Sequence, residues 1–206
     1  MLFKNRQDAG RQLAAELQSL KINDGLIIGL PRGGVVVADE IARTLGLPLD
    51  IIIPRKIGAP FNPELAIGAL VEDTVLLNDA LIDELGIDAL YIQSEIAKEK
   101  KEAARRLALF RHGKSSPAFK GRTIIVADDG IATGATMRAS LQYLKSKGAG
   151  RLIAAVPVAP PETVKQLQKD GFEVICLYTP VSFAAVGQFY EEFPQTQDSE
   201  VIKILG

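Results

Sequence analysis

The chain has 206 residues, of which 47% are hydrophobic and 24% charged, with one histidine, one cysteine and a net charge of −1. This composition is typical of a globular domain with a full core. The charge balance argues against a broad nucleic-acid-binding surface, and the single His and Cys exclude a disulfide framework or a His–Cys metal cluster. The amino terminus lacks the apolar core of a signal peptide, and Pro31 and Arg32 interrupt the longest apolar stretch. We therefore expect a cytoplasmic protein without a membrane span.

Residues 5–20 are predicted to form a helix, because Asn5 can cap it and its leucines recur on one face. The apolar run Gly25–Leu30 predicts a buried strand, and Val35–Leu45 predicts a helix that ends at Gly46. Between strand and helix stands Pro31-Arg32-Gly33-Gly34. An arginine beside paired glycines favours an anion, because guanidinium matches phosphate oxygens and glycine lets backbone approach a ligand.

A third apolar run, Leu49–Ile53, predicts another strand, and Arg55 and Lys56 follow it. A ligand role and a solvated charge are equally consistent with Arg55, whereas we expect Lys56 to contact a ligand. Three prolines and Gly58 predict that residues 54–64 form an irregular loop. Leu65–Val71 and Thr74–Leu77 then predict an antiparallel hairpin.

Asp88–Arg111 predicts one long helix with an apolar side, and Glu102 and Arg106 have the spacing of a helical ion pair. We expect most of its charges to form a solvated face. Arg105, Arg106 and Arg111 could alternatively reach a polyphosphate. His112 is interpreted as a cation beside the carboxyl end of this helix rather than as a catalyst.

The stretch from Ile124 to Thr136 combines a buried strand, the acidic pair Asp128–Asp129 and a loop of small residues that enters a helix. Such a loop presents backbone N–H groups at a helix amino terminus, so Ala132–Thr136 suits one phosphate group. The carboxylates suit ribose hydroxyls as hydrogen-bond acceptors, or alternatively a divalent cation. The loop and the acidic pair together predict a ribose 5-phosphate site.

Two further strands, Arg151–Val158 and Glu173–Tyr178, flank a helix that begins at Pro160-Pro161. The alternation of strands and helices predicts an α/β fold with about five mostly parallel strands and helices on both faces.

The central stretch resembles the 5-phosphoribosyl-1-pyrophosphate (PRPP) motif of the type I phosphoribosyltransferases, with Ala135 where the family has a second glycine. Arg-Lys-Ile-Gly-Ala-Pro-Phe-Asn-Pro-Glu-Leu, residues 55–65, resembles the uncharacterised branch of that superfamily. The resemblance implies transfer of the phosphoribosyl group from PRPP to a nitrogenous acceptor, with release of pyrophosphate and with Mg²⁺ carried by PRPP. The acceptor would be a small molecule, such as a nucleobase, with no nucleic acid or membrane partner.

The resemblance also implies roles for particular residues. Arg32 and Lys56 would be the catalytic cations, and Arg32, Gly33 and Gly34 would bind pyrophosphate. The ribose and 5-phosphate would lie on Asp128, Asp129, Ala132, Thr133, Gly134, Ala135 and Thr136, with Asp128 and Asp129 holding the metal directly or through water. Phe183 is the candidate for stacking on the base, although covering the core is an equally good interpretation of it.

The resemblance further implies one domain over residues 1–206, with a small hood from both terminal segments and a flexible hairpin at about 56–78. A homodimer and a cis peptide bond at Pro31–Arg32 are expected. Ala132 replaces the acid that 6-oxopurine enzymes of the family place there, which argues against hypoxanthine or guanine as acceptor. Two alternatives remain: a regulatory protein that binds PRPP or a nucleotide without catalysis, and a nucleotide-binding domain of another superfamily. Against the latter, the chain lacks a Gly-Lys-Ser/Thr loop.

Overall fold

The computed structural model describes residues 2–206; Met1, which the expected domain includes, lies outside the described residues. Its main feature is a five-stranded sheet with the order β2-β1-β6-β7-β8, in which all neighbouring strands are parallel. This arrangement confirms the predicted α/β class. The strands are β1 (Gly25–Gly29), β2 (Leu49–Ile51), β6 (Thr123–Ala127), β7 (Arg151–Val158) and β8 (Glu173–Tyr178).

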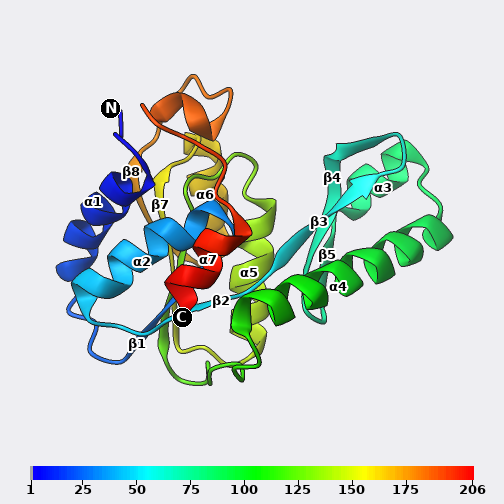
Figure 1. Ribbon diagram of the computed structural model, residues 1–206. Helices are drawn as coiled ribbons and strands as arrows, with labels where there is room; N and C mark the ends of the chain where they lie inside the picture. Colours follow the sequence, from blue (N-terminus) through cyan, green and yellow to red (C-terminus); the bar gives the residue numbers. More distant parts are fainter. Residues whose placement is uncertain (1) are drawn as a thin grey trace.

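Helices cover both faces of this sheet (Figure 1). Helices α1 (Arg6–Gln18) and α2 (Gly33–Leu45) cover one face, and α5 (Ala135–Ser146) and α6 (Pro161–Lys169) cover the other. Successive strand residues point to opposite faces. In β6, Ile125 therefore packs with α1 and α2, while Ile124 and Val126 pack with α5 and α6.

A second sheet is antiparallel and has the order β3-β4-β5. Its strands are β3 (Pro54–Ala59), β4 (Asn62–Val71) and β5 (Thr74–Leu77), so the predicted hairpin is confirmed. The prediction of an irregular loop over residues 54–64 is wrong. The prolines are tolerated because Pro54 opens an edge strand, and because the register shifts on either side of Gly58, which lies against Pro63.

The predicted long helix is confirmed as α4 (Ala89–Arg111). A short helix, α3 (Asp79–Leu85), was not predicted from the sequence; the Asn78 side chain caps it by accepting a hydrogen bond from the Leu81 N–H (3.3 Å). Figure 1 shows the second sheet, α3 and one end of α4 projecting from the main body. An apolar cluster holds the second sheet against α4 and the carboxy-terminal helix α7 (Asp198–Leu205).

The two terminal segments lie against each other. The Phe3 N–H donates to the Phe189 carbonyl, and the Glu191 N–H donates to the Phe3 carbonyl, each at 2.8 Å. Phe3 and Tyr190 are buried beside the 3-10 helix η1 (Val186–Phe189). Among residues 2–206, no helix is long and apolar enough to cross a membrane.

Candidate ligand-binding site

Two loops leave the same edge of the main sheet and touch each other. Strands β1 and β6 run parallel with Gly29 opposite Ala127, so the turn of residues 31–34 and the acidic pair emerge side by side. A Cβ on Gly34 would lie 2.8 Å from the Asp128 Oδ1 atom. The absence of a side chain at Gly34 therefore allows the acidic pair to pack against this turn. The peptide bond between Pro31 and Arg32 is cis, as predicted.

The small-residue loop has the geometry of an anion site. Gly134, at φ 78°, turns the chain into α5, and the N–H groups of residues 133–136 donate no hydrogen bond to any other described residue. The Thr163 hydroxyl donates to the Ala132 carbonyl (2.7 Å) and fixes the loop from α6. Ala135 is the first residue of α5 and has no positive φ, so alanine fits where the family motif has glycine. Backbone N–H groups at a helix amino terminus favour an anion.

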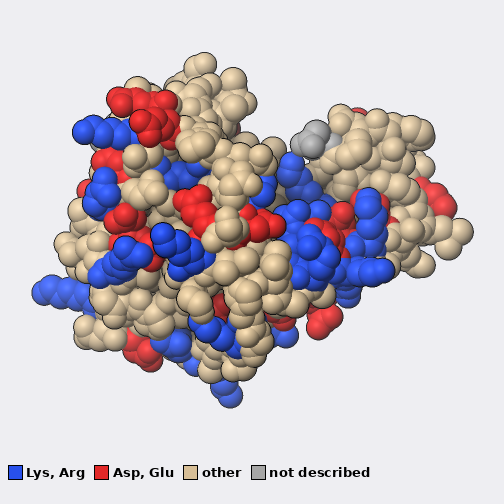
Figure 2. Space-filling view, viewed as in Figure 1, with Lys and Arg blue, Asp and Glu red and all other residues tan. Residues whose placement is uncertain are grey.

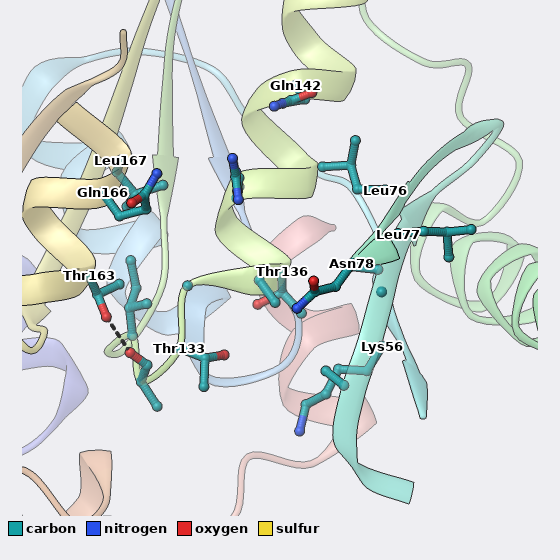
Figure 3. Close-up of a pocket in the computed structure, with 18 of the residues that line it drawn as sticks. Lys56, Leu76, Leu77, Asn78, Thr133, Thr136, Gln142, Thr163, Gln166 and Leu167 are labelled. Carbon is teal, nitrogen blue, oxygen red and sulfur yellow. Dashed lines mark hydrogen bonds between the residues drawn. The ribbon is translucent and has the colours of Figure 1, made fainter. Parts of the chain in front are cut away.

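A cavity of about 920 Å³ lies over this loop. Asp128 and residues 130–136 line its floor, and Thr163, Gln166 and Leu167 of α6 line one side. The second sheet forms the opposite side, with Lys56, Leu76 and Leu77 (Figure 3). In Figure 3 the Lys56 side chain extends from β3 toward the part of the loop that carries Thr133. The structure therefore brings Lys56, Asp128 and the loop together around one cavity.

The two carboxylates of the acidic pair have different surroundings. Asp128 lines the cavity, and its Oδ1 accepts a hydrogen bond from the Asp129 N–H (2.9 Å). Asp129 instead forms an ion pair with Arg6 of α1, with 2.7 Å between Nε and Oδ2. Burial, and then the neighbouring Asp129 carboxylate, raise the pKa of Asp128 well above its usual range. Burial also raises the pKa of Asp129, but the Arg6 guanidinium opposes that effect.

Other predicted site residues lie elsewhere. Arg32 does not line this cavity, and its Nη1 lies 3.6 Å from the Asp198 Oδ1 of α7. Phe183, half-buried, packs against Phe189 with 5.3 Å between ring centroids, and it does not line the cavity either. Gly33 lies against the ion pair between Arg6 and Asp129 and does not line the cavity.

Several basic side chains that do not line the cavity form ion pairs with carboxylates of the chain. Arg55 Nε lies 2.6 Å from the buried Glu99, which ties β3 to α4. Both Arg105 and Arg106 bind Glu102 at 2.7 Å, the latter at the predicted helical spacing. Arg111 binds Asp50 and the Ile51 carbonyl. Figure 2 shows basic and acidic side chains gathered together where the main body meets the projecting part.

The donor set fits Mg²⁺ only as a cation that arrives with a phosphate ligand. Among the described side chains, which do not include those of Met1 and Glu64, no group of three or more His, Cys, Asp or Glu could hold a metal ion by itself. Asp128 is the carboxylate of the acidic pair that lines the cavity. Mg²⁺ bound through one or two carboxylates and substrate phosphates is a common arrangement.

Several contributors to this region were not predicted from the sequence. Arg6 reaches Asp129 across 123 positions of the chain, so no local pattern could indicate it. Gln142 and Gln166 also line the cavity. Gln166 lies in the helix that follows β7, so the rule that parallel strands present ligands at their carboxyl ends could have suggested that helix.

The fold and the site together define an α/β domain in which an acidic pair precedes a small-residue loop at a helix amino terminus. The chain belongs to the phosphoribosyl transferase domain family, whose model matches residues 2–191. A Mycobacterium tuberculosis (H37Rv) protein named "Putative phosphoribosyl transferase Rv0571c" is 45% identical over 205 residues, which are 99% of this chain and 46% of that protein. This chain thus spans about half the length of the curated relatives it matches most fully.

Two further relatives are informative. The crystal structure of TT1426 from Thermus thermophilus has a TM-score of 0.85 and 42% identity, and the match covers 100% of this chain and 98% of that chain. A Prochlorococcus marinus protein named "Ribose-phosphate pyrophosphokinase" is 34% identical over 90 residues, which are 42% of this chain and 26% of that protein. The first similarity extends over the whole fold, whereas the second is limited to one part of the chain.

Proposed function

We propose that the protein transfers the 5-phosphoribosyl group of PRPP to a nitrogen atom of a small acceptor and releases pyrophosphate. The observation that carries this proposal is the single cavity shared by Asp128, the anion loop of residues 132–136 and Lys56. Membership of the phosphoribosyl transferase family supports the same reaction class. The cavity volume of about 920 Å³ is within the usual range for small-molecule sites.

Each group has a role in this mechanism. The N–H groups of residues 133–136 and the hydroxyls of Thr133 and Thr136 hold the 5-phosphate, and Asp128 accepts hydrogen bonds from the ribose hydroxyls. Lys56 stabilises the negative charge that develops on the departing pyrophosphate. Mg²⁺ bound to PRPP supplies further charge neutralisation at the phosphates, and Asp128 or its hydrogen-bonded water would hold it.

In the reaction, the acceptor nitrogen forms a bond to C1 of the ribose while the bond from C1 to the pyrophosphate oxygen breaks. The bonding electrons leave with pyrophosphate, and the acceptor nitrogen loses its proton to solvent or base. Holding both reactants beside the loop lowers the entropic part of the barrier. We assign Arg32 and Gly34 to pyrophosphate, which requires Arg32 to leave Asp198 when the ligand binds.

The test is release of pyrophosphate from Mg²⁺–PRPP across a panel of nucleobases and amines, with Lys56→Gln and Asp128→Asn as variants. Release that depends on one acceptor, and that both substitutions reduce at least tenfold, supports the transferase. PRPP binding without release for any acceptor would instead favour a regulatory protein. Absence of PRPP binding would contradict both.

We also propose a homodimer. Phe61 is 96% exposed at the tip of the second sheet, and Leu90, near the start of α4, is 73% exposed. Exposed apolar side chains that cluster on one projection favour association with another protein surface. Sedimentation of a monomer at micromolar concentration would contradict this proposal.

A further inference from the structure

The most unusual charged group outside the cavity is Arg6. It is the first residue of α1 and is only 8% exposed. A buried cation at a helix amino terminus is unfavourable twice, because burial desolvates the charge and because the helix dipole is positive there. Such a group needs a strong compensating partner, and its contacts show which partner it has.

Arg6 contacts groups from distant parts of the chain. Its Nε donates to the Asp129 Oδ2 and its Nη1 donates to the Pro194 carbonyl, both at 2.7 Å. The guanidinium carbon lies 3.7 Å from the centroid of the Phe193 ring, which gives a cation–π contact. Arg6 therefore links α1, the carboxy-terminal segment and the acidic pair.

The ion pair also lies directly behind the turn of residues 31–34. A Cβ on Gly33 would lie 1.9 Å from the Asp129 Oδ2 and 2.7 Å from the Arg6 Nε. From the other side, the Tyr190 hydroxyl donates to the Asp129 backbone carbonyl (2.5 Å). Asp129 is thus fixed at its side chain and at its backbone.

We propose that Arg6 is a positioning residue. It holds the Asp129 carboxylate away from the ligand cavity, so that Asp128 is the member of the acidic pair that faces the ligand. This inference rests on the proposed binding of PRPP. The two aspartates then have different roles. Asp129 anchors the loop to α1 and the carboxy-terminal segment, and Asp128 contacts the ribose or its metal. Arg6 itself touches no ligand.

The physical reason is the short distance between the two carboxylates. The Asp129 N–H already binds Asp128 Oδ1, so the position of Asp129 sets where the Asp128 side chain lies. Without Arg6, the Asp129 carboxylate would be buried without a cation, and it would turn toward water, toward Asp128 or toward a bound metal. Each of these movements displaces Asp128 from the geometry that the loop presents to a ribose 5-phosphate.

The test is the dissociation constant of Mg²⁺–PRPP, measured by titration calorimetry at a temperature where thermal scans show every variant folded. The variants are Arg6→Gln, Arg6→Lys, Asp129→Asn and the double variant Arg6→Gln/Asp129→Asn. The matched control is Arg11→Gln, which removes an ion-paired arginine one turn further along α1 that is 56% exposed in its side chain.

We expect Arg6→Gln to raise the dissociation constant at least tenfold, Arg6→Lys to raise it less, and Arg11→Gln to leave it unchanged. In the Asp129→Asn background, Arg6→Gln should change it less than twofold, because Arg6 acts through Asp129. A purely structural role would lower the unfolding temperature without this coupling. If Arg6→Gln does not fold, Arg6→Lys alone and in the Asp129→Asn background gives the same comparison.

Equal affinity for the wild type and both Arg6 variants would overturn the positioning role while leaving the proposed function intact. Additive losses in the double variant would also overturn it, because Arg6 would then contact the ligand itself. Absence of binding to the wild type would refute the proposed function and, with it, any role of Arg6 in ligand positioning.

Discussion

Gly33 and Asp129 lie so close that the structure leaves no room for a side chain at position 33. A Cβ there would lie 1.9 Å from the Asp129 Oδ2, well inside van der Waals contact. The first turn of α2 and the acidic pair are therefore packed as one unit, although 96 positions of sequence separate them. A substitution at Gly33 therefore tests how far the acidic pair depends on its packing against this turn.

Gly33→Ala should destabilise the protein by about 1–3 kcal/mol, because the added methyl group must displace the Asp129–Arg6 ion pair. PRPP affinity should fall with it. The matched control is Gly46→Ala at the other end of α2, where φ is +65° but nothing lies within 4 Å. That variant should cost about 1–2 kcal/mol and leave PRPP affinity unchanged. Urea unfolding and calorimetry measure the two effects, and equal affinities for the two variants would contradict the prediction.

The two aspartates should respond differently to the same substitution. Asp129→Asn leaves the buried Arg6 without its carboxylate, which typically costs ~3–5 kcal/mol of folding free energy. Asp128→Asn should cost little stability but weaken PRPP binding by ~1.5–3 kcal/mol, the value of one charged hydrogen-bond partner. Urea unfolding of both variants beside the wild type measures the contrast. Equal stability losses would show that the acidic pair is not divided as proposed.

The raised pKa of Asp128 predicts a pH dependence of stability. From about pH 4, where an unfolded aspartate titrates, up to its raised pKa, the folded state holds a proton that the unfolded state has lost. The free energy of unfolding therefore falls as pH rises through this window and stays lowered above it. Asp128→Asn removes this contribution, so the free energy of unfolding of the variant should fall less than that of the wild type as pH rises above about 4. If the free energies of unfolding of the variant and the wild type change in parallel with pH, the pKa of Asp128 is not raised in the folded state.

The contact between Arg32 and Asp198 predicts competition for pyrophosphate. Asp198→Asn removes the carboxylate that lies 3.6 Å from the Arg32 guanidinium, so pyrophosphate should bind a few-fold more tightly. Arg32→Gln should weaken pyrophosphate binding in both backgrounds. Calorimetry with Mg²⁺–pyrophosphate makes the comparison. If Asp198→Asn has no effect, then Arg32 does not exchange one anionic partner for another.

Cys176 should react slowly with alkylating reagents. Burial raises the pKa of its thiol to about 11, so very little thiolate forms at pH 8. The higher nucleophilicity of a basic thiolate offsets part of this loss, which leaves an expected rate at least ~10-fold below that of the unfolded chain. Since it is the single cysteine, mass spectrometry after iodoacetamide treatment, with and without urea, reads it directly. Equal rates would show that the thiol is accessible in the folded state.

Much of the fold was predictable because its signals are local. Buried parallel strands are continuous apolar runs, as in Thr123–Ala127, and helix ends carry their own caps, as at Asn5 and Gly46. The second sheet was harder to predict. Proline and Gly58 favour loops locally, and only pairing at a sheet edge with a register shift allowed them into β3 and β4.

The small-residue loop and the acidic pair could be predicted from local sequence, because both are contiguous and their chemistry is that of adjacent backbone and side chains. Which of the two carboxylates lines the cavity depends on contacts between distant parts of the chain. Asp128 and Asp129 are neighbours of identical chemistry, and what distinguishes them is an arginine 123 positions away and a glycine on the adjoining strand's loop. Arg6 reaches Asp129 because α1, the turn before α2 and the carboxy-terminal segment pack together at one edge of the sheet. A local sequence pattern cannot indicate such a contact.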